Sequence, residues 1–175
     1  MCISLETVTP LTLLHLPTPR EGNMTGTTNT SARCECGALA LHIKGAPVVQ
    51  LVCHCSDCRA FSGMPYIELA FFQPDGLSVH GQASSTTMKG GTGFDKTHYS
   101  CASCQTPLYV TVAALNGASA VMANRLSPFK FEPQAHICTS EKANDVTIPA
   151  GITQSSGAPP KEIADTMVSS FWGRK

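Results

Sequence analysis

Three cysteines lie within six positions of the chain, in the run Cys53–Cys58, which reads CHCSDC. Two further pairs, Cys34 with Cys36 and Cys101 with Cys104, lie before and after it. Cysteines separated by one residue rarely bridge each other, because disulfide geometry limits the separation and direction of their side chains. Tight clusters of this kind are typical of metal ligands in a reducing compartment. Since thiolate-rich tetrahedral sites select zinc among the common metals, the sequence predicts a zinc protein with seven candidate thiolate ligands.

The seven thiols can be divided between metal ions in more than one way. Two pairs can close a four-cysteine structural site, which leaves Cys53, Cys55 and Cys58 as a second site with one open position, the pattern of a catalytic zinc. A zinc ribbon could instead join Cys55 and Cys58 to the pair at 101 and 104. A single structural zinc with spare thiols is a third option. Spacing favours the first division without deciding between the three.

Short segments of alternating hydrophobicity, separated by turn signals, must position these cysteines. We expect strands over residues 38–43, 48–52, 66–72, 77–80, 108–112 and 118–123, and two more flanking a loop at 88–94. Gln73–Gly76 and Asn116-Gly117 are the clearest turn signals. Residues 161–172 carry apolar side chains at helical spacing, namely Ile163, Ala164, Met167, Val168 and Phe171. The sequence therefore predicts a mostly β domain with a short amphipathic C-terminal helix that packs on the domain or on a partner subunit.

The chain has 175 residues, which suits one domain. We expect a flexible leader at residues 1–31, rich in Thr, Pro and Asn, a zinc domain at 32–150, and a linker with the tail helix at 151–175. The formal net charge is zero, so neither a nucleic acid nor an anionic membrane is expected as a partner. No stretch approaches the roughly 18 apolar residues of a membrane span, and the N-terminus lacks the basic start of a signal peptide. We therefore expect a cytoplasmic protein.

Three motifs together resemble the glutathione-dependent formaldehyde-activating enzyme family, which also includes centromere protein V. They are RCECGAL at residues 33–39, CHCSDCRxxSG at 53–63 and CASCQTPLY at 101–109. The resemblance runs from about residue 32 to residue 137 and implies a β-tent fold with two zinc ions per chain. It implies that Cys34, Cys36, Cys101 and Cys104 are the structural ligands, and that Cys53, Cys55 and Cys58 hold the second, substrate-facing zinc. This agrees with the four-plus-three division.

The chain departs from the family pattern at two places. The family usually has glycine after the second cysteine of the last pair, where this chain has Gln105. We therefore expect this turn to bend differently, because glycine would relieve it. The family often has an aromatic residue where this chain has Cys138, in the run His136-Ile137-Cys138, and the Trp and Pro that often follow are missing. These changes fall where we expect the walls of the substrate pocket, so they concern the substrate more than the fold.

The chemistry implied is that of a thiol bound at an open zinc. Three thiolates leave the zinc site with a net negative charge, and such a zinc suits binding and deprotonating another thiol. For the family, glutathione adds to formaldehyde to give S-(hydroxymethyl)glutathione, which is carbon–sulfur lyase chemistry in the cleavage direction. We therefore expect a zinc-dependent lyase with a small-molecule substrate, glutathione and an aldehyde being the candidates, and a homo-oligomer is compatible with the sequence. One alternative is a zinc Lewis acid that acts on a carbonyl or hydroxyl group of a larger metabolite. Another is a non-catalytic, zinc-stabilised binding module.

Individual side chains near the cysteines allow two interpretations each. Arg59 could hold a substrate carboxylate through paired hydrogen bonds, or could neutralise the anionic zinc–thiolate group. His98 is a candidate pocket base, although a structural hydrogen bond is the favoured interpretation. His54 is expected to be an outward-facing spacer rather than an acid–base group. Cys138 is expected to be a lone thiol buried as a small apolar residue, and Cys2 is given no role.

Overall fold

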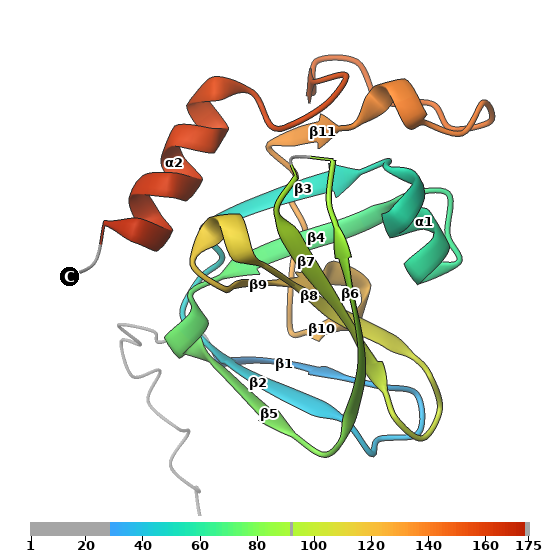
Figure 1. Ribbon diagram of the computed structural model, residues 1–175, viewed down its shortest axis with the longest axis vertical. Coiled ribbons are helices and arrows are strands. Elements are labelled where there is room, and N and C mark those ends of the chain that lie inside the picture. The colour runs from blue at the N-terminus through green and yellow to red at the C-terminus, as the bar shows by residue number, and fades with distance from the viewer. Residues whose placement is uncertain (1–28, 92, 174–175) are drawn as a thin grey trace, which may run out of the picture.

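The computed structural model describes residues 29–91 and 93–173 of the chain, which form two β-sheets and two α-helices (Figure 1). The smaller sheet has the strand order β10-β1-β2-β5, with every neighbouring pair antiparallel. Its strands are β1 (Asn29–Arg33), β2 (Ala40–Lys44), β5 (Leu77–His80) and β10 (Leu126–Ser127). The expected leader ended at residue 31, so its last residues lie in β1, and residues 1–28 lie outside the described part.

The larger sheet has eight strands in the order β12-β11-β3-β4-β9-β8-β7-β6. Its strands are β3 (Val49–Cys53), β4 (Ile67–Phe72), β6 (Ala83–Lys89), β7 (Asp95–Cys101), β8 (Pro107–Val112), β9 (Ala118–Met122), β11 (Ala135–Ile137) and β12 (Thr153–Gln154). All neighbours are antiparallel except that β11 pairs in parallel with both β3 and β12. The mostly β, β-tent class expected from the sequence is confirmed, and the parallel pairing of β11 is a departure from it.

Strand β4 shows why the two sheets stay together. Ile67, Leu69 and Phe71 contact one hydrophobic cluster, whereas Ala70 and Phe72 contact another. Successive side chains of a strand point to opposite faces, so β4 is buried on both sides. This explains its nearly continuous apolar sequence. In Figure 1, β1, β2 and β5 lie below β3, β4 and β9, and the second cluster fills the space between them.

Two α-helices flank the larger sheet. Helix α1 (Ser56–Ser62) follows β3 directly and ends at Gly63, whose φ of 69° allows the chain to turn away. Helix α2 (Lys161–Trp172) coincides with the expected tail helix and buries Met167 and Phe171 against the domain. Val168 was expected on the same face but is 50% exposed, because it is rotated by about 100° from Met167.

Four single turns of 3-10 helix complete the described elements: η1 (Pro74–Gly76), η2 (Ala113–Leu115), η3 (Ala123–Arg125) and η4 (Thr139–Glu141). The first of them lies in the turn predicted at 73–76. Asn116 and Gly117 both have positive φ, at 53° and 75°, as the predicted hairpin turn between β8 and β9 requires. Within the described residues, no helix combines the length and apolar character that crossing a bilayer requires.

Candidate metal centres

The first candidate centre is a four-cysteine group formed by Cys34, Cys36, Cys101 and Cys104, whose sulfur atoms all lie within 4.8 Å of one another. The Sγ atom of Cys36 lies 3.5 Å from that of Cys34 and 3.8 Å from that of Cys101. Zinc–sulfur bonds of about 2.3 Å in a tetrahedron place sulfur atoms about 3.8 Å apart, so this donor set fits a zinc ion. The pair at 34 and 36 follows β1, whereas Cys101 ends β7 and Cys104 lies in the turn before β8. The centre therefore ties the smaller sheet to the larger one.

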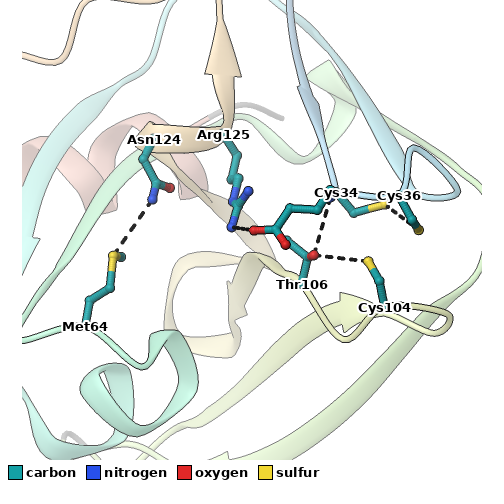
Figure 2. A network of polar contacts seen from close by, with 8 residues as sticks. Cys34, Cys36, Met64, Cys104, Thr106, Asn124 and Arg125 are labelled. Carbon is teal, nitrogen blue, oxygen red and sulfur yellow. Dashed lines mark hydrogen bonds and ion pairs between the residues drawn. The ribbon is translucent and has the colours of Figure 1, made fainter.

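Hydrogen bonds hold the sulfur atoms of this group in place. The backbone N–H of Leu39 donates to Cys34 Sγ at 3.1 Å. Thr106 Oγ1 accepts from the backbone N–H of Glu35 at 3.3 Å and lies 3.0 Å from Cys104 Sγ (Figure 2). Its hydroxyl proton is thus free to point at that sulfur, and this hydrogen bond is the largest cause of the low pKa of Cys104, about 5. Thr106 therefore joins the two cysteine turns and favours the thiolate that a metal requires.

The turn after Cys104, where we expected a different bend because glycine is missing, holds Gln105 in a left-handed conformation. Gln105 has a φ of 57°, in the left-handed region that glycine adopts without strain. Its backbone N–H donates to the Cys101 carbonyl at 2.9 Å, and its side-chain Nε2 donates to the Ala102 carbonyl at 3.2 Å. The backbone at Gln105 is therefore strained, because a residue with a Cβ atom occupies the left-handed region.

An ion pair from η3 also supports the four-cysteine group. Arg125 Nη2 donates to Glu35 Oε1 at 2.9 Å, as Figure 2 shows, and Glu35 lies between the two cysteines of the first pair. Glu35 is largely exposed, with 71% of its side-chain surface accessible, so the net energy of this pair is small. Its effect is to connect the first cysteine turn to the segment that leads into β10.

The second candidate centre is a three-cysteine group formed by Cys53, Cys55 and Cys58, whose sulfur atoms also lie within 4.8 Å of one another. Cys53 ends β3, and its thiol donates to Cys55 Sγ at 3.5 Å. Cys55 caps the N-terminus of α1, where its sulfur accepts from the backbone N–H of Cys58 at 3.4 Å. The structure therefore groups the cysteines as four plus three. It does not bring Cys55 and Cys58 to Cys101 and Cys104, as a zinc ribbon would require.

Cys138 packs half-buried against the hydrophobic cluster that contains Cys53 and Cys58, in keeping with its expected role as a small apolar residue. It is not isolated from the other cysteines, however. The nearby thiols of Cys138, Cys53 and Cys58, in that order, lower the pKa of Cys55. No local pattern in the sequence signals this proximity, because the parallel pairing of β11 with β3 creates it.

Lys96 is a neighbour of the three-cysteine group that sequence reasoning missed. Its Nζ atom pairs with Asp57 Oδ2 at 2.7 Å and donates to Cys55 Sγ at 3.9 Å. Burial opposes its charge, but the Asp57 contact and the nearby thiols of Cys55 and Cys58 raise the pKa of Lys96 overall. The ammonium group thus offsets the negative charge that thiolates accumulate. It comes from β7, and only the tertiary fold reveals its position.

His54 is fully buried, which contradicts its expected role as an outward-facing spacer. Its Nε2 atom lies 3.0 Å from Nδ1 of His136, and its ring tilts against Tyr66. Burial first, and then the positive charge of a protonated His136, lower the pKa of His54 to about 4. Side chains alternate along the end of β3, so His54 points away from its two cysteine neighbours. It is a neutral, structural partner of His136.

A pocket of about 310 Å³ lies between α1 and the hairpin of β6 and β7. Nine residues line it: Asp57, Ala60, Phe61, Ser84, Thr86, Met88, His98, Ser100 and Gln105. His98 stacks on Phe61 with ring centroids 4.4 Å apart, and its buried Nε2 atom has no hydrogen-bond partner. Burial lowers the pKa of His98, so the ring is neutral at pH 7. The sequence favoured a structural hydrogen bond for His98, and the Nε2 atom of the ring does not make one.

Arg59 does not line this pocket. Its buried Nε atom lacks a hydrogen-bond partner, and its charge is one of the causes of the low pKa of His54. Arg59 and His98 therefore lie in different surroundings, and the structure does not bring them together in one cavity. Among the described residues, Arg59 has no carboxylate partner within ion-pair distance.

The comparison with protein families matches the glutathione-dependent formaldehyde-activating enzyme over residues 29–141, which is more than half of the chain. This chain therefore belongs to that family. Comparison with curated proteins gave no match. Among solved structures, the chain is similar to the crystal structure of a Rhodobacter sphaeroides protein, a structural genomics target, with 20% identity and a TM-score of 0.45. That similarity covers 57% of this chain and 90% of the other.

Proposed function

We propose that the chain binds two zinc ions and uses the three-cysteine group for carbon–sulfur chemistry, the addition of a thiol to a small aldehyde and its reversal. The observation that carries this proposal is the separation of the cysteines into a closed group of four and a group of three, with α1 contributing both Cys58 to the group of three and Asp57 to the lining of an open pocket. Four ligands are typical of structural zinc, whereas three leave a position for substrate. Membership of the formaldehyde-activating family supports the substrate class, with glutathione as the thiol and formaldehyde as the aldehyde.

A zinc ion at the three-cysteine group would supply a lowered pKa for a bound thiol, and so a nucleophile at neutral pH. The chain's own side chains would compensate charge, bind the substrate and transfer the proton. Lys96 lies 3.9 Å from Cys55 Sγ and would keep the thiolate-rich site from repelling an anionic substrate. Arg59 carries a positive charge without a carboxylate partner in the described residues, and we assign it to a carboxylate of the thiol substrate.

His98 is the group in the pocket that can move a proton. Its low pKa keeps the imidazole neutral at pH 7, so one ring nitrogen can donate and the other can accept. His98 lines the cavity and its buried Nε2 atom has no hydrogen-bond partner, so this nitrogen is the one that we assign to the oxygen atom of an aldehyde. When the sulfur–carbon bond forms, that oxygen gains a proton, and when the bond breaks it loses one. We therefore assign His98 to proton transfer at the aldehyde oxygen.

A second candidate function keeps the zinc and changes the substrate to a larger metabolite with a carbonyl or hydroxyl group. The apolar walls of the pocket, Phe61 and Met88, favour it, because formaldehyde has no apolar surface to place there. Thiol ligands must stay reduced to bind a metal, which is compatible with a cytoplasmic location for either function.

The test is the exchange between formaldehyde and S-(hydroxymethyl)glutathione, followed by NMR with and without protein. The wild-type chain should accelerate the exchange at catalytic concentration. Cys55→Ser should abolish the acceleration, and Cys2→Ser should leave it unchanged. An exchange rate that stays at the uncatalysed value with stoichiometric, zinc-loaded protein would exclude this reaction and favour the larger-metabolite function.

A further inference from the structure

We propose that Cys138 supplies a fourth, exchangeable thiolate to the three-cysteine group, so that the chain's own sulfur closes the resting site and a substrate thiol must displace it. This inference rests on the proposed binding of zinc at that group. Three ligands alone would leave the fourth position on the metal open, whereas in this arrangement Cys138 occupies that position when no substrate is bound.

The first support is the way in which the backbone aims Cys138 at the group. Strand β11 pairs in parallel with β3 so that Ile137 is level with Cys53. The backbone N–H of His54 donates to the Ile137 carbonyl at 3.1 Å, one residue beyond the end of β3. Cys138, the residue after β11, is therefore level with His54, the residue after β3. It packs on the cluster that holds Cys53 and Cys58, and its thiol is near enough to Cys53 and Cys55 to shift the pKa of both.

The second support is the strained backbone of Cys138 itself. Its φ of 55° and ψ of 38° lie in the left-handed region, which is unfavourable for a residue with a Cβ atom. Non-glycine residues held in such conformations cluster at functional sites. A residue that only filled space would gain nothing from this conformation.

The third support is the set of bonds that holds this strained residue from the outside. The Cys138 N–H donates to the Gly157 carbonyl at 2.8 Å, and the backbone N–H and the hydroxyl of Thr139 both donate to the Ser155 carbonyl at 3.0 Å. On the other side, Glu141 Oε2 accepts from the backbone N–H of Ser56 at 2.8 Å. The segment after β11 is thus fastened both to residues 155–157 and to the start of the helix that carries Cys58.

The geometry also explains why Cys138 would be the exchangeable ligand. Cys53, Cys55 and Cys58 lie within 4.8 Å of one another, and Cys138 stands outside that set. Cys53 and Cys58 are buried, whereas Cys55 and Cys138 are both half-buried and can be reached by an incoming molecule. The sulfur of Cys55 is held by the backbone N–H of Cys58 at the start of α1, and the sulfur of Cys138 accepts no such bond from the described residues. Cys138 also comes from a separate loop, whereas the other three lie on one strand end and one short helix. Cys53, Cys55 and Cys58 would therefore stay bound to the metal ion while Cys138 exchanges with the substrate thiol.

The exchange is balanced in atoms and charge. The S–H bond of the incoming thiol breaks, and its sulfur takes the position that Cys138 leaves. The released proton forms an S–H bond at Cys138, so the site carries the same charge before and after the exchange. Addition to the aldehyde leaves an alkoxide oxygen, which takes up that proton, so the neutral product leaves and Cys138 returns as a thiolate. Cys138 would then act as an internal proton acceptor for the substrate thiol and would protect the site when no substrate is present.

The test uses cobalt in place of zinc, because each thiolate bound to Co²⁺ contributes to the near-ultraviolet charge-transfer band. We compare Cys138→Gly, which keeps the left-handed backbone without a thiol, with Cys138→Ser. The matched control is Gln105→Gly, which removes a side chain from an equally left-handed position that carries no thiol. All variants carry Cys2→Ser, and the metal ions per chain are counted in each.

Both Cys138 variants should retain two metal ions and lose about one-eighth of the band, the share of one thiolate in eight. Glutathione should restore the band in Cys138→Gly and leave the wild-type intensity unchanged, since there it only exchanges with Cys138. In the metal-loaded wild-type chain, iodoacetamide should spare Cys138 and should modify it once glutathione is added. Two metal ions with an unchanged band in the Cys138 variants and rapid modification of Cys138 would overturn this inference alone. One metal ion per wild-type chain would overturn the proposed function as well.

Discussion

The backbone N–H of His54 donates to the carbonyl oxygen of Ile137 across 3.1 Å, and this bond extends the parallel pairing of β3 and β11 past the end of β3. Its consequence is that two segments far apart in the sequence place their cysteines together. Three thiols come from the end of β3 and from α1, and Cys138 comes from the residue after β11. The position of Cys138, the proposed fourth ligand, therefore depends on a strand of three residues.

Lys96 should support metal binding at the three-cysteine group. Lys96→Met removes the ammonium group that faces Cys55 and leaves Asp57 as an unpaired negative charge beside the thiolates. We expect the second metal to bind about 10-fold more weakly, the lower end of the range for changes to groups that surround metal ligands. The measurement is a chelator competition. Lys89→Met is the matched control, because its exposed pair with Asp95 lies in the same hairpin, and it should leave the affinity unchanged.

His98 should make the fold less stable in mild acid. Burial holds its pKa below the unfolded value of about 6.5, so between these two values the unfolded chain binds more protons than the folded one. The free energy of unfolding should therefore fall as the pH falls through that window. His98→Gln removes this contribution. Denaturant titrations at pH 7.5 and pH 5 should show a smaller loss for the variant than for the wild type, and equal losses would contradict the burial of a neutral His98. Acid release of zinc affects both proteins alike.

The turn at Gln105 should be more stable with glycine, which adopts the left-handed conformation of this position without strain. Gln105→Gly relieves the left-handed strain, and Gln105→Ala retains it, while both remove the same exposed side-chain bonds to Ala102 and Ser84. We expect the glycine variant to exceed the alanine variant by about 1 kcal/mol in unfolding free energy. Thermal unfolding of the zinc-loaded proteins measures the difference. An alanine variant as stable as the glycine variant would show that the turn is not strained.

The strands that carry clear alternation could be predicted from the sequence, because their period of two reflects one buried and one less buried face. Helix α1 could not, since its seven residues overlap the cysteine motif and bury only Cys58. The four-plus-three division was already suggested by the three clusters, with the family resemblance, since each cluster is local. The positions of Lys96 and Cys138 beside the three-cysteine group could not be predicted, because they are not set by local sequence. They approach the group only through strand pairing between distant segments.

His54 shows how a local pattern can mislead. Its place between two cysteines predicted an outward side chain, and alternation does turn it away from them. The far side of that strand end is not solvent, however, because β11 lies there with His136. A single sequence does not show which strand covers an edge, so the burial of His54 could not be predicted.

We propose that the cysteines form one closed structural site and one separate site for chemistry. The number of zinc ions per chain, measured together with the circular dichroism spectrum in wild type, Cys55→Ser and Cys101→Ser, tests this division. We expect two zinc ions in the wild type, and one in a Cys55→Ser chain that keeps its β spectrum. Cys101→Ser should lose the fold, because a structural zinc contributes directly to stability. One zinc ion in the wild type, or unfolding of Cys55→Ser with a stable Cys101→Ser, would contradict it.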